Sequence, residues 1–168
     1  MIGTALRYAA QAAVYAAVAL LLGFFAQSPR YQAFPADMAQ IKLSLAHGAQ
    51  PKGECRRLSR AELDKLPPNM RKPVSCPRQR LPLLVELLVD GRTVYSASVE
   101  PTGLSGDGPS RVYERFAVTP GRHQITARLR ESARTEGFDY ERTAEILLRP
   151  GQNLAIDFRA ETGGFLFL

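Results

Sequence analysis

The chain has 168 residues, which is enough for one folded domain and an appendage. It carries 22 Lys and Arg residues against 16 Asp and Glu, a net charge of +6. We interpret the basic residues as dispersed. The absence of a basic patch with interleaved aromatic residues argues against nucleic acid as a partner. The moderate positive excess fits an anionic membrane surface or an acidic partner protein.

An uncharged run follows the first residues. Residues 8–26 read YAAQAAVYAAVALLLGFFA, 19 residues without a charge. A helix of this length, at about 1.5 Å per residue, covers most of a hydrocarbon core of about 30 Å. We predict a cytoplasmic N-terminus at 1–7 and a transmembrane helix at 8–26. A cleaved signal peptide is the alternative, but cleavage after Ala26 would place the large Phe24 where a small residue is expected.

The orientation follows from the short N-terminus and from the two cysteines, which suit an oxidising compartment. We expect a single-pass protein of the bacterial inner membrane with its C-terminal domain in the periplasm. Ala9, Ala13 and Ala17 recur every four residues in the helix, and small residues at this spacing let another helix approach closely. They are candidate contacts with a partner helix. An Ala-rich anchor without such a partner is the alternative.

The rest of the chain divides into a linker, a domain with an insertion, and a tail. Residues 27–37 contain two prolines and form the linker. We predict an extracytoplasmic β domain at 38–160 and an apolar tail at 161–168. The domain contains an insertion at 55–76 that begins and ends with a cysteine. Within the insertion, Ser59-Arg60-Ala61-Glu62 has the spacing of a capping box and predicts a short helix that Pro67 and Pro68 end.

Alternating apolar residues predict the strands of the domain. Leu83, Val85, Leu87 and Val89 define one face of a strand whose other face is also apolar, so we expect it to be central. The pattern predicts about seven strands, as in a small sandwich. They lie at 41–45, 83–89, 92–99, 111–118, 122–130, 140–148 and 153–159.

Turn signals predict three hairpins. Asp90-Gly91 joins 83–89 to 92–99, because Gly tolerates the positive φ of a primed turn. The turn at 119–121 pairs 111–118 with 122–130, and the turn at 149–152 pairs 140–148 with 153–159. The predicted fold class is all-β, a small immunoglobulin-like β-sandwich behind one transmembrane helix.

Two segments resemble the PEGA class of small β domains. They are VELLVDGRTVY (85–95) and FAVTPGRHQITARL (116–129), in which Asp90-Gly91 and Pro120-Gly121-Arg122-His123 match the turns of that class. The resemblance implies a PEGA-like, extracytoplasmic, non-catalytic β domain and names no ligand. In architecture alone, an anchor followed by a β domain is similar to FixH-type accessory proteins of respiratory oxidase assembly.

Cys55 and Cys76 are the only cysteines. Outside the cytoplasm an isolated pair usually forms a disulfide, and closing a loop of about 20 residues contributes roughly 3 kcal/mol in the chain-entropy model. A redox or copper-binding thiol pair is the alternative. His47, His123, Met38 and Met70 are the other soft ligands that copper could use, but their spacing does not group them. We expect His123, which alternates with core residues, to be a partly buried structural side chain.

The sequence shows no catalytic constellation, since Ser105 lies in GLSGDG, which is not the G-x-S-x-G elbow. We expect no enzyme activity, no cofactor, no bound metal and no small-molecule substrate. The expected role is that of a membrane-anchored accessory protein that positions or stabilises an envelope complex by binding another envelope or integral membrane protein. A copper-handling or redox accessory protein for respiratory oxidase assembly is the alternative.

The apolar tail contributes further candidate contacts. Phe165, Leu166, Phe167 and Leu168 follow a Gly pair, and alternation would make both of their faces apolar. Large exposed apolar side chains cost roughly 1.5–3 kcal/mol each relative to burial. We therefore predict that the tail packs, either as an edge strand on its own domain or against a partner near the membrane.

Overall fold

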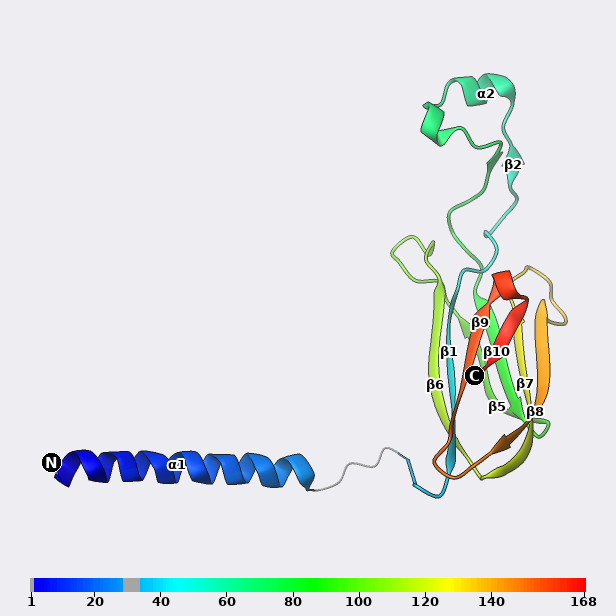
Figure 1. Cartoon of the computed structure of the whole chain (residues 1–168). Helices are drawn as coiled ribbons and strands as arrows, with labels where there is room; N and C mark the ends of the chain where they lie inside the picture. The colour runs from blue at the N-terminus through cyan, green and yellow to red at the C-terminus, as the bar shows by residue number, and fades with distance from the viewer. Residues whose placement is uncertain (1, 29–33) are drawn as a thin grey trace. The chain divides into compact units, whose positions relative to one another are not determined.

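The computed structural model describes residues 2–28 and 34–168. The chain divides into two compact units, residues 1–35 and residues 36–168. The first unit contains the helix α1, and the second unit consists largely of strands. The predicted combination of an N-terminal apolar helix with a mainly β domain is therefore confirmed (Figure 1).

Helix α1 spans Ile2–Gln27 and begins before the predicted membrane segment. Its stretch Gly3–Gln27 is long and apolar enough to cross a membrane, and none of the tested window is buried inside the protein. Apolar side chains around the whole helix need lipid or another protein to cover them. Ala9, Ala13 and Ala17 are among the exposed residues, and their contact with a partner helix stays a prediction. Part of the predicted linker, residues 29–33, lies outside the described residues.

The second unit contains two four-stranded sheets, with strand orders β10-β9-β1-β6 and β5-β4-β7-β8. Every neighbouring pair is antiparallel except β1 and β9, which run parallel. All seven predicted strands are present, and β10 adds an eighth to these sheets. The strands are β1 (Ala39–His47), β4 (Leu83–Val89), β5 (Arg92–Val99), β6 (Ser110–Val118), β7 (Gly121–Arg130), β8 (Tyr140–Leu148), β9 (Asn153–Arg159) and β10 (Gly164–Phe167).

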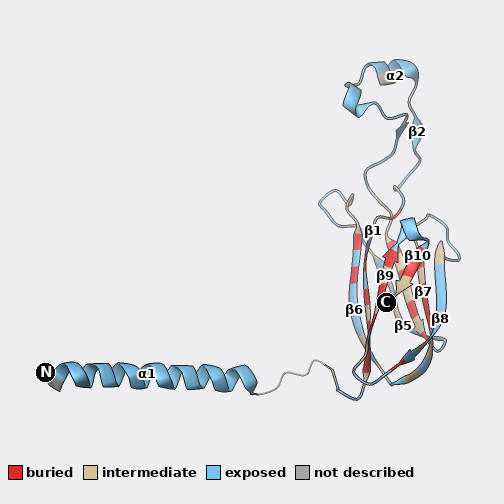
Figure 2. Ribbon diagram, viewed as in Figure 1, coloured by how far each residue is buried: buried red, intermediate tan, exposed pale blue. Residues whose placement is uncertain are grey.

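Each sheet contributes rows of apolar side chains to one shared core (Figure 2). In β4 the residues alternate between buried and half-buried, and the strand lies between β5 and β7, as its two apolar faces predicted. One row of alternating apolar residues in β7 and one in β9 are also buried. These rows are Ile125, Ala127 and Leu129 in β7, and Leu154, Ile156 and Phe158 in β9.

Only one of the three predicted hairpins is present. Asp90 and Gly91 adopt φ values of 52° and 77° and join β4 to β5, as a primed turn requires. The other two pairings are wrong. β6 pairs with β1 rather than β7, and β9 pairs with β1 and β10 rather than β8.

The two wrong pairings share a physical reason. The turns at 119–121 and 149–152 each contain a Pro-Gly pair and lead the chain from one sheet to the other. A Pro-Gly pair favours a chain reversal, but it does not decide whether the second strand lies beside the first or across the core. Crossing the core places the apolar rows of successive strands on opposite sides of one buried volume, which removes them from water.

The tail forms the edge strand β10 beside β9. Phe165 is 2% exposed, and its ring centroid lies 5.2 Å from that of Phe158. Phe165 therefore belongs to the core of its own domain, and the prediction that it contacts a partner is wrong for the folded domain, because packing against β9 buries it first. Leu166 and Phe167 are half-buried and Leu168 is exposed, so for these three residues the partner contact stays a prediction.

Arg142 of β8 covers the outer edge of β10. Its Nη1 donates a hydrogen bond of 2.6 Å to the carbonyl oxygen of Phe165, and its guanidinium lies 5.5 Å from the centroid of the Phe167 ring. An uncovered edge strand presents unpaired backbone groups to other chains. Arg142 satisfies one of these groups and links the edges of the two sheets.

Replacing Phe165 by Ala should therefore destabilise the domain by about 3–5 kcal/mol, because the change leaves a cavity in the core. Chemical denaturation of the full chain in mild detergent measures this effect. Leu168→Ala is the matched control. Its exposed side chain should change the free energy of unfolding by no more than about 0.5 kcal/mol. Equal effects of the two substitutions would place Phe165 outside the core.

Candidate functional site

The segment from Pro51 to Arg80, which we call the arm, extends from the domain between β1 and β4 (Figure 1). An isolated β-bridge between Pro51 and Arg80 closes its base. The arm contains β2 (Arg56–Arg57), α2 (Arg60–Asp64), the 3₁₀ helix η1 (Pro68–Met70) and β3 (Val74–Ser75). β2 and β3 pair antiparallel, so the two legs of the arm run side by side. No residue between Pro51 and Arg80 belongs to the core.

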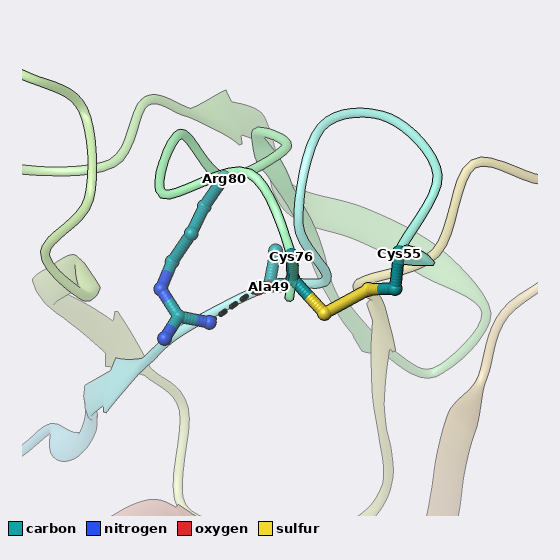
Figure 3. Close-up of a disulfide and its surroundings, with 4 residues drawn as sticks. All are labelled: Ala49, Cys55, Cys76 and Arg80. Carbon is teal, nitrogen blue, oxygen red and sulfur yellow. Dashed lines mark hydrogen bonds between the residues drawn. A yellow bond between two sulfur atoms is a disulfide. The ribbon is translucent and has the colours of Figure 1, made fainter. Parts of the chain in front are cut away.

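A disulfide joins the two legs (Figure 3). Cys55 and Cys76 are bonded, with their Cα atoms 4.2 Å apart, so the predicted pairing is confirmed. Both cysteines of the chain are used in this bond. The cross-link lies directly before β2 and directly after β3, and it holds the short ladder between them in register.

Arg80 ties the base of the arm to the domain (Figure 3). Its Nη1 donates to the carbonyl of Ala49 at 2.8 Å, and its Nε donates to the carbonyl of Asp107 at 3.1 Å. Arg78 adds an ion pair with the Asp107 carboxylate at 2.9 Å. A Cβ added to Gly48 would lie 3.1 Å from the Arg80 guanidinium carbon, so the absence of a side chain at position 48 leaves room for this clamp. The loop before β6 thus anchors the arm.

The predicted capping box is present at the tip of the arm. The Ser59 hydroxyl accepts from the Glu62 backbone N–H at 3.3 Å, and the Glu62 carboxylate accepts from the Ser59 backbone N–H at 2.8 Å. Arg56 donates to the same carboxylate at 2.6 Å. The hydrogen bond from Arg56 is the largest cause that lowers the pKa of Glu62 to about 2. Glu62 therefore stays ionised and joins α2 to β2.

The positive charge of the protein is concentrated in the arm. Nine of the 22 Lys and Arg residues, but only three of the 16 Asp and Glu residues, lie between Pro51 and Arg80. The arm thus has an excess of six positive charges, which equals the net charge of +6 of the whole chain. The interpretation that the basic residues are dispersed is wrong. A count of charges by segment would have revealed the cluster from the sequence.

Apolar side chains are exposed beside these charges. Met70 is 58% exposed and Val74 is 41% exposed. Together with Leu58 and Leu66 they line a shallow hollow of about 700 Å³, and Lys72 and Arg78 lie at the same hollow. The arm therefore offers a mixed apolar and cationic surface on a cross-linked, clamped support.

His123 forms a structural contact between two turns. Its Nδ1 lies 2.7 Å from the Asp90 carboxylate and its Nε2 lies 2.7 Å from the Thr119 carbonyl oxygen. Both partners are acceptors, so the imidazole makes both bonds only when both of its nitrogens are protonated. The bond to Asp90 is the largest cause that raises the pKa of His123, and the same bond chiefly lowers the pKa of Asp90.

The other predicted soft ligands are spread over the domain. His47 bonds the Glu131 carboxylate, and its ring packs against Phe158 with the centroids 4.8 Å apart. Met38 and His123 line one shallow hollow, whereas Met70 lies in the arm. Within residues 2–28 and 34–168, no group of three or more His, Cys, Asp or Glu side chains is arranged to hold a metal ion.

Comparison of the chain with protein-family models, with curated proteins and with solved structures found no match. The resemblances to PEGA domains and to FixH-type proteins therefore stay predictions. The structure joins the two turns on which the PEGA resemblance rests, because Asp90 of the first turn bonds His123 at the end of the second.

Loss of the disulfide should loosen the arm before the core. The double change Cys55→Ser and Cys76→Ser removes a cross-link that contributes roughly 3 kcal/mol in the chain-entropy model. The measured loss should be smaller than that value, because an arm with no core residue regains chain entropy while the sheets stay folded. Limited trypsin digestion should cut the variant within the arm faster than the parent protein, at temperatures where circular dichroism shows intact sheets. Simultaneous loss of arm and sheet signals would contradict this separation.

The contact between His123 and Asp90 should make stability depend on pH. Because the pKa of His123 is raised in the folded protein, the contact stabilises the domain fully below the pKa of the unfolded state, about 6.5. This stabilisation disappears as the pH rises through the pKa of His123 in the folded state. Because the pKa of Asp90 is lowered in the folded protein, its stabilising effect is fully present above the pKa of the unfolded state, about 3.9. This effect disappears as the pH falls through the pKa of Asp90 in the folded state. The stability lost in His123→Gln should therefore be larger at pH 5.5 than at pH 9. Urea denaturation of both proteins at the two pH values checks this, and equal losses would exclude the charged form of the contact.

Proposed function

We propose that this chain is a membrane-anchored periplasmic binding protein that positions or stabilises a complex in the envelope. The observation that carries the proposal is the combination of an exposed apolar helix, long enough to span a membrane, with a domain that holds a disulfide. A disulfide suits an oxidising compartment, and one apolar helix on the N-terminal side of the domain suits a single-pass anchor in the inner membrane with the domain outside.

A binding role is supported by where the exposed features lie. The sheets are built around a shared core, while the arm displays cations and apolar side chains without contributing to that core. Exposed apolar surface on a soluble domain is a common mark of an interaction site. The partner in this proposal is another protein of the envelope, and the anchor keeps the domain at the membrane where that partner is found.

The fold is proposed to be an immunoglobulin-like β-sandwich. Two four-stranded sheets that share one core, and chain crossings between them after β5, β6 and β8, support this assignment.

Native gel electrophoresis of membranes solubilised in mild detergent tests the function. The tagged chain should migrate in an assembly larger than itself, and N-terminal sequencing of the same material should begin before residue 8. A matched control replaces α1 by a cleavable signal peptide, which should release the domain and lower the amount of assembly. Migration of the parent chain as a free monomer, or a mature chain that begins near Gln27, would overturn the proposal. Stoichiometric copper in the purified chain would instead favour the copper-handling alternative.

A further inference from the structure

We propose that the arm is the docking surface of this protein, and that its partner is a protein with an acidic surface around an apolar centre. This inference rests on the proposed binding function and specifies the site and the kind of partner. Its starting point is the charge distribution, since the arm accounts for the whole net charge of +6 and the rest of the chain is balanced. An acidic surface is the electrostatic complement of the arm. No segment outside the arm has as large an excess of positive charge.

Several cations of the arm are available for a partner. Arg56 pairs with Glu62 and Arg78 pairs with Asp107. Five other basic side chains form no ion pair with any residue that the structure describes, and all five are exposed. They are Lys52, Arg57, Arg60, Lys65 and Lys72. In the rest of the domain, Arg128, Arg134 and Arg159 have carboxylate partners, and the basic residues of the chain outside the arm are equal in number to the acidic residues there.

The apolar hollow supplies the centre of the contact. Leu58, Leu66, Met70 and Val74 line it, with Lys72 and Arg78 beside them. Met and Arg are enriched in protein interfaces, and the flexible Met side chain adapts to the shape of a partner. Apolar residues at the centre with cations around them match the usual arrangement of an interface, an apolar core inside a polar rim.

The support of the arm reduces the entropic cost of binding. The disulfide fixes the two legs to each other, and Arg80 fixes the base to Ala49 and to the loop that contains Asp107. A surface that is already ordered loses less conformational freedom when a partner binds. Arg80 is in this respect a positioning residue, whereas the unpaired cations are contact residues.

Composition and position favour a protein over a lipid surface or a nucleic acid. Residues 51–80 contain no Phe, Tyr or Trp, and aromatic side chains are typical both of segments that insert into the membrane interface and of surfaces that stack on bases. The chain leads into the domain at Ala39, and the arm follows His47 at the other end of β1. The arm and the point of attachment therefore lie at opposite ends of the domain.

The experiment uses the full chain in native membranes with a photo-crosslinking amino acid at Met70. The matched control carries the same group at Leu147, which is 55% exposed against 58% for Met70 but lies on β8. The first expected result is a protein adduct at position 70 and none at position 147. Peptide mapping should then place the adduct in a segment of the partner rich in Asp and Glu.

Charge reversal makes the test specific. The pair Arg57→Glu and Lys72→Glu should lower the adduct yield at position 70 by about tenfold, because it replaces attraction by repulsion across the contact. The pair Arg122→Glu and Arg149→Glu changes the net charge equally on the domain and should leave the yield unchanged. Formation of the disulfide, read by mass spectrometry, checks that the two legs of the arm are cross-linked in each variant. The milder pair Arg57→Gln and Lys72→Gln should give an intermediate yield.

Three results would overturn the inference. The first is a lipid adduct at position 70, which would point to the membrane surface. The second is a protein adduct that charge reversal does not reduce, and the third is the absence of any adduct at position 70. Native gel electrophoresis of the Arg57→Glu, Lys72→Glu variant separates the two proposals. An assembly that persists in this variant would retain the binding function and reject the arm as its site, whereas absence of an assembly in the parent chain would reject the function itself.

Discussion

The chain leaves β1 in one sheet and returns in β4 of the other, and burial of both strands in one core holds the two ends of the arm close together. Leu43 and Leu45 near the end of β1, and Leu83 and Val85 at the start of β4, belong to this core. The polar contacts at the base of the arm depend on it, since Arg80 reaches Ala49 and Asp107 only while the strands and the loop around it keep their places. Burial of apolar surface is the main favourable term in folding. Here it also fixes the positions of the residues at the base of the exposed arm.

In the proposed function, stability and recognition belong to different parts of the domain. The sheets contain the buried apolar rows, whereas the arm is held by a covalent bond, a two-residue ladder and a few polar contacts. Changes at the tip of the arm affect few interactions of the core, so the surface can vary without loss of the fold. Loops on a rigid scaffold commonly have this relationship to the elements that support them.

The electrostatics follow the same division. Acidic and basic residues balance outside the arm, and the excess of six positive charges lies within it. Such an asymmetric charge would steer the proposed acidic partner toward one end of the domain and make its association sensitive to salt. The Glu62 carboxylate, the one acidic group of the arm with an ion pair among the described residues, stabilises the start of α2 and so contributes to the shape of the surface.

Features that depend on nearby residues were predictable from the sequence. The alternation in β4, β7 and β9 identified strands and inward faces, the uncharged run identified α1, and Asp90-Gly91 and Ser59–Glu62 identified a turn and a helix start. Each of these patterns acts over a few residues, through backbone geometry or the period of side chains. The pairing of the only two cysteines also followed from composition and compartment.

The tertiary structure decided which distant residues meet. The Pro-Gly turns cross between sheets, β1 pairs with β9, Phe165 fills the core, and Asp90 bonds His123. Local sequence permits several of these pairings, and the choice among them depends on how all the apolar rows are buried together. The arm shows both contributions. Its charge can be counted from the sequence, but its exposure and its clamped base depend on the tertiary structure. Burial of β1 and β4 in one core brings residues 51 and 80 close enough to form the bridge at the base of the arm.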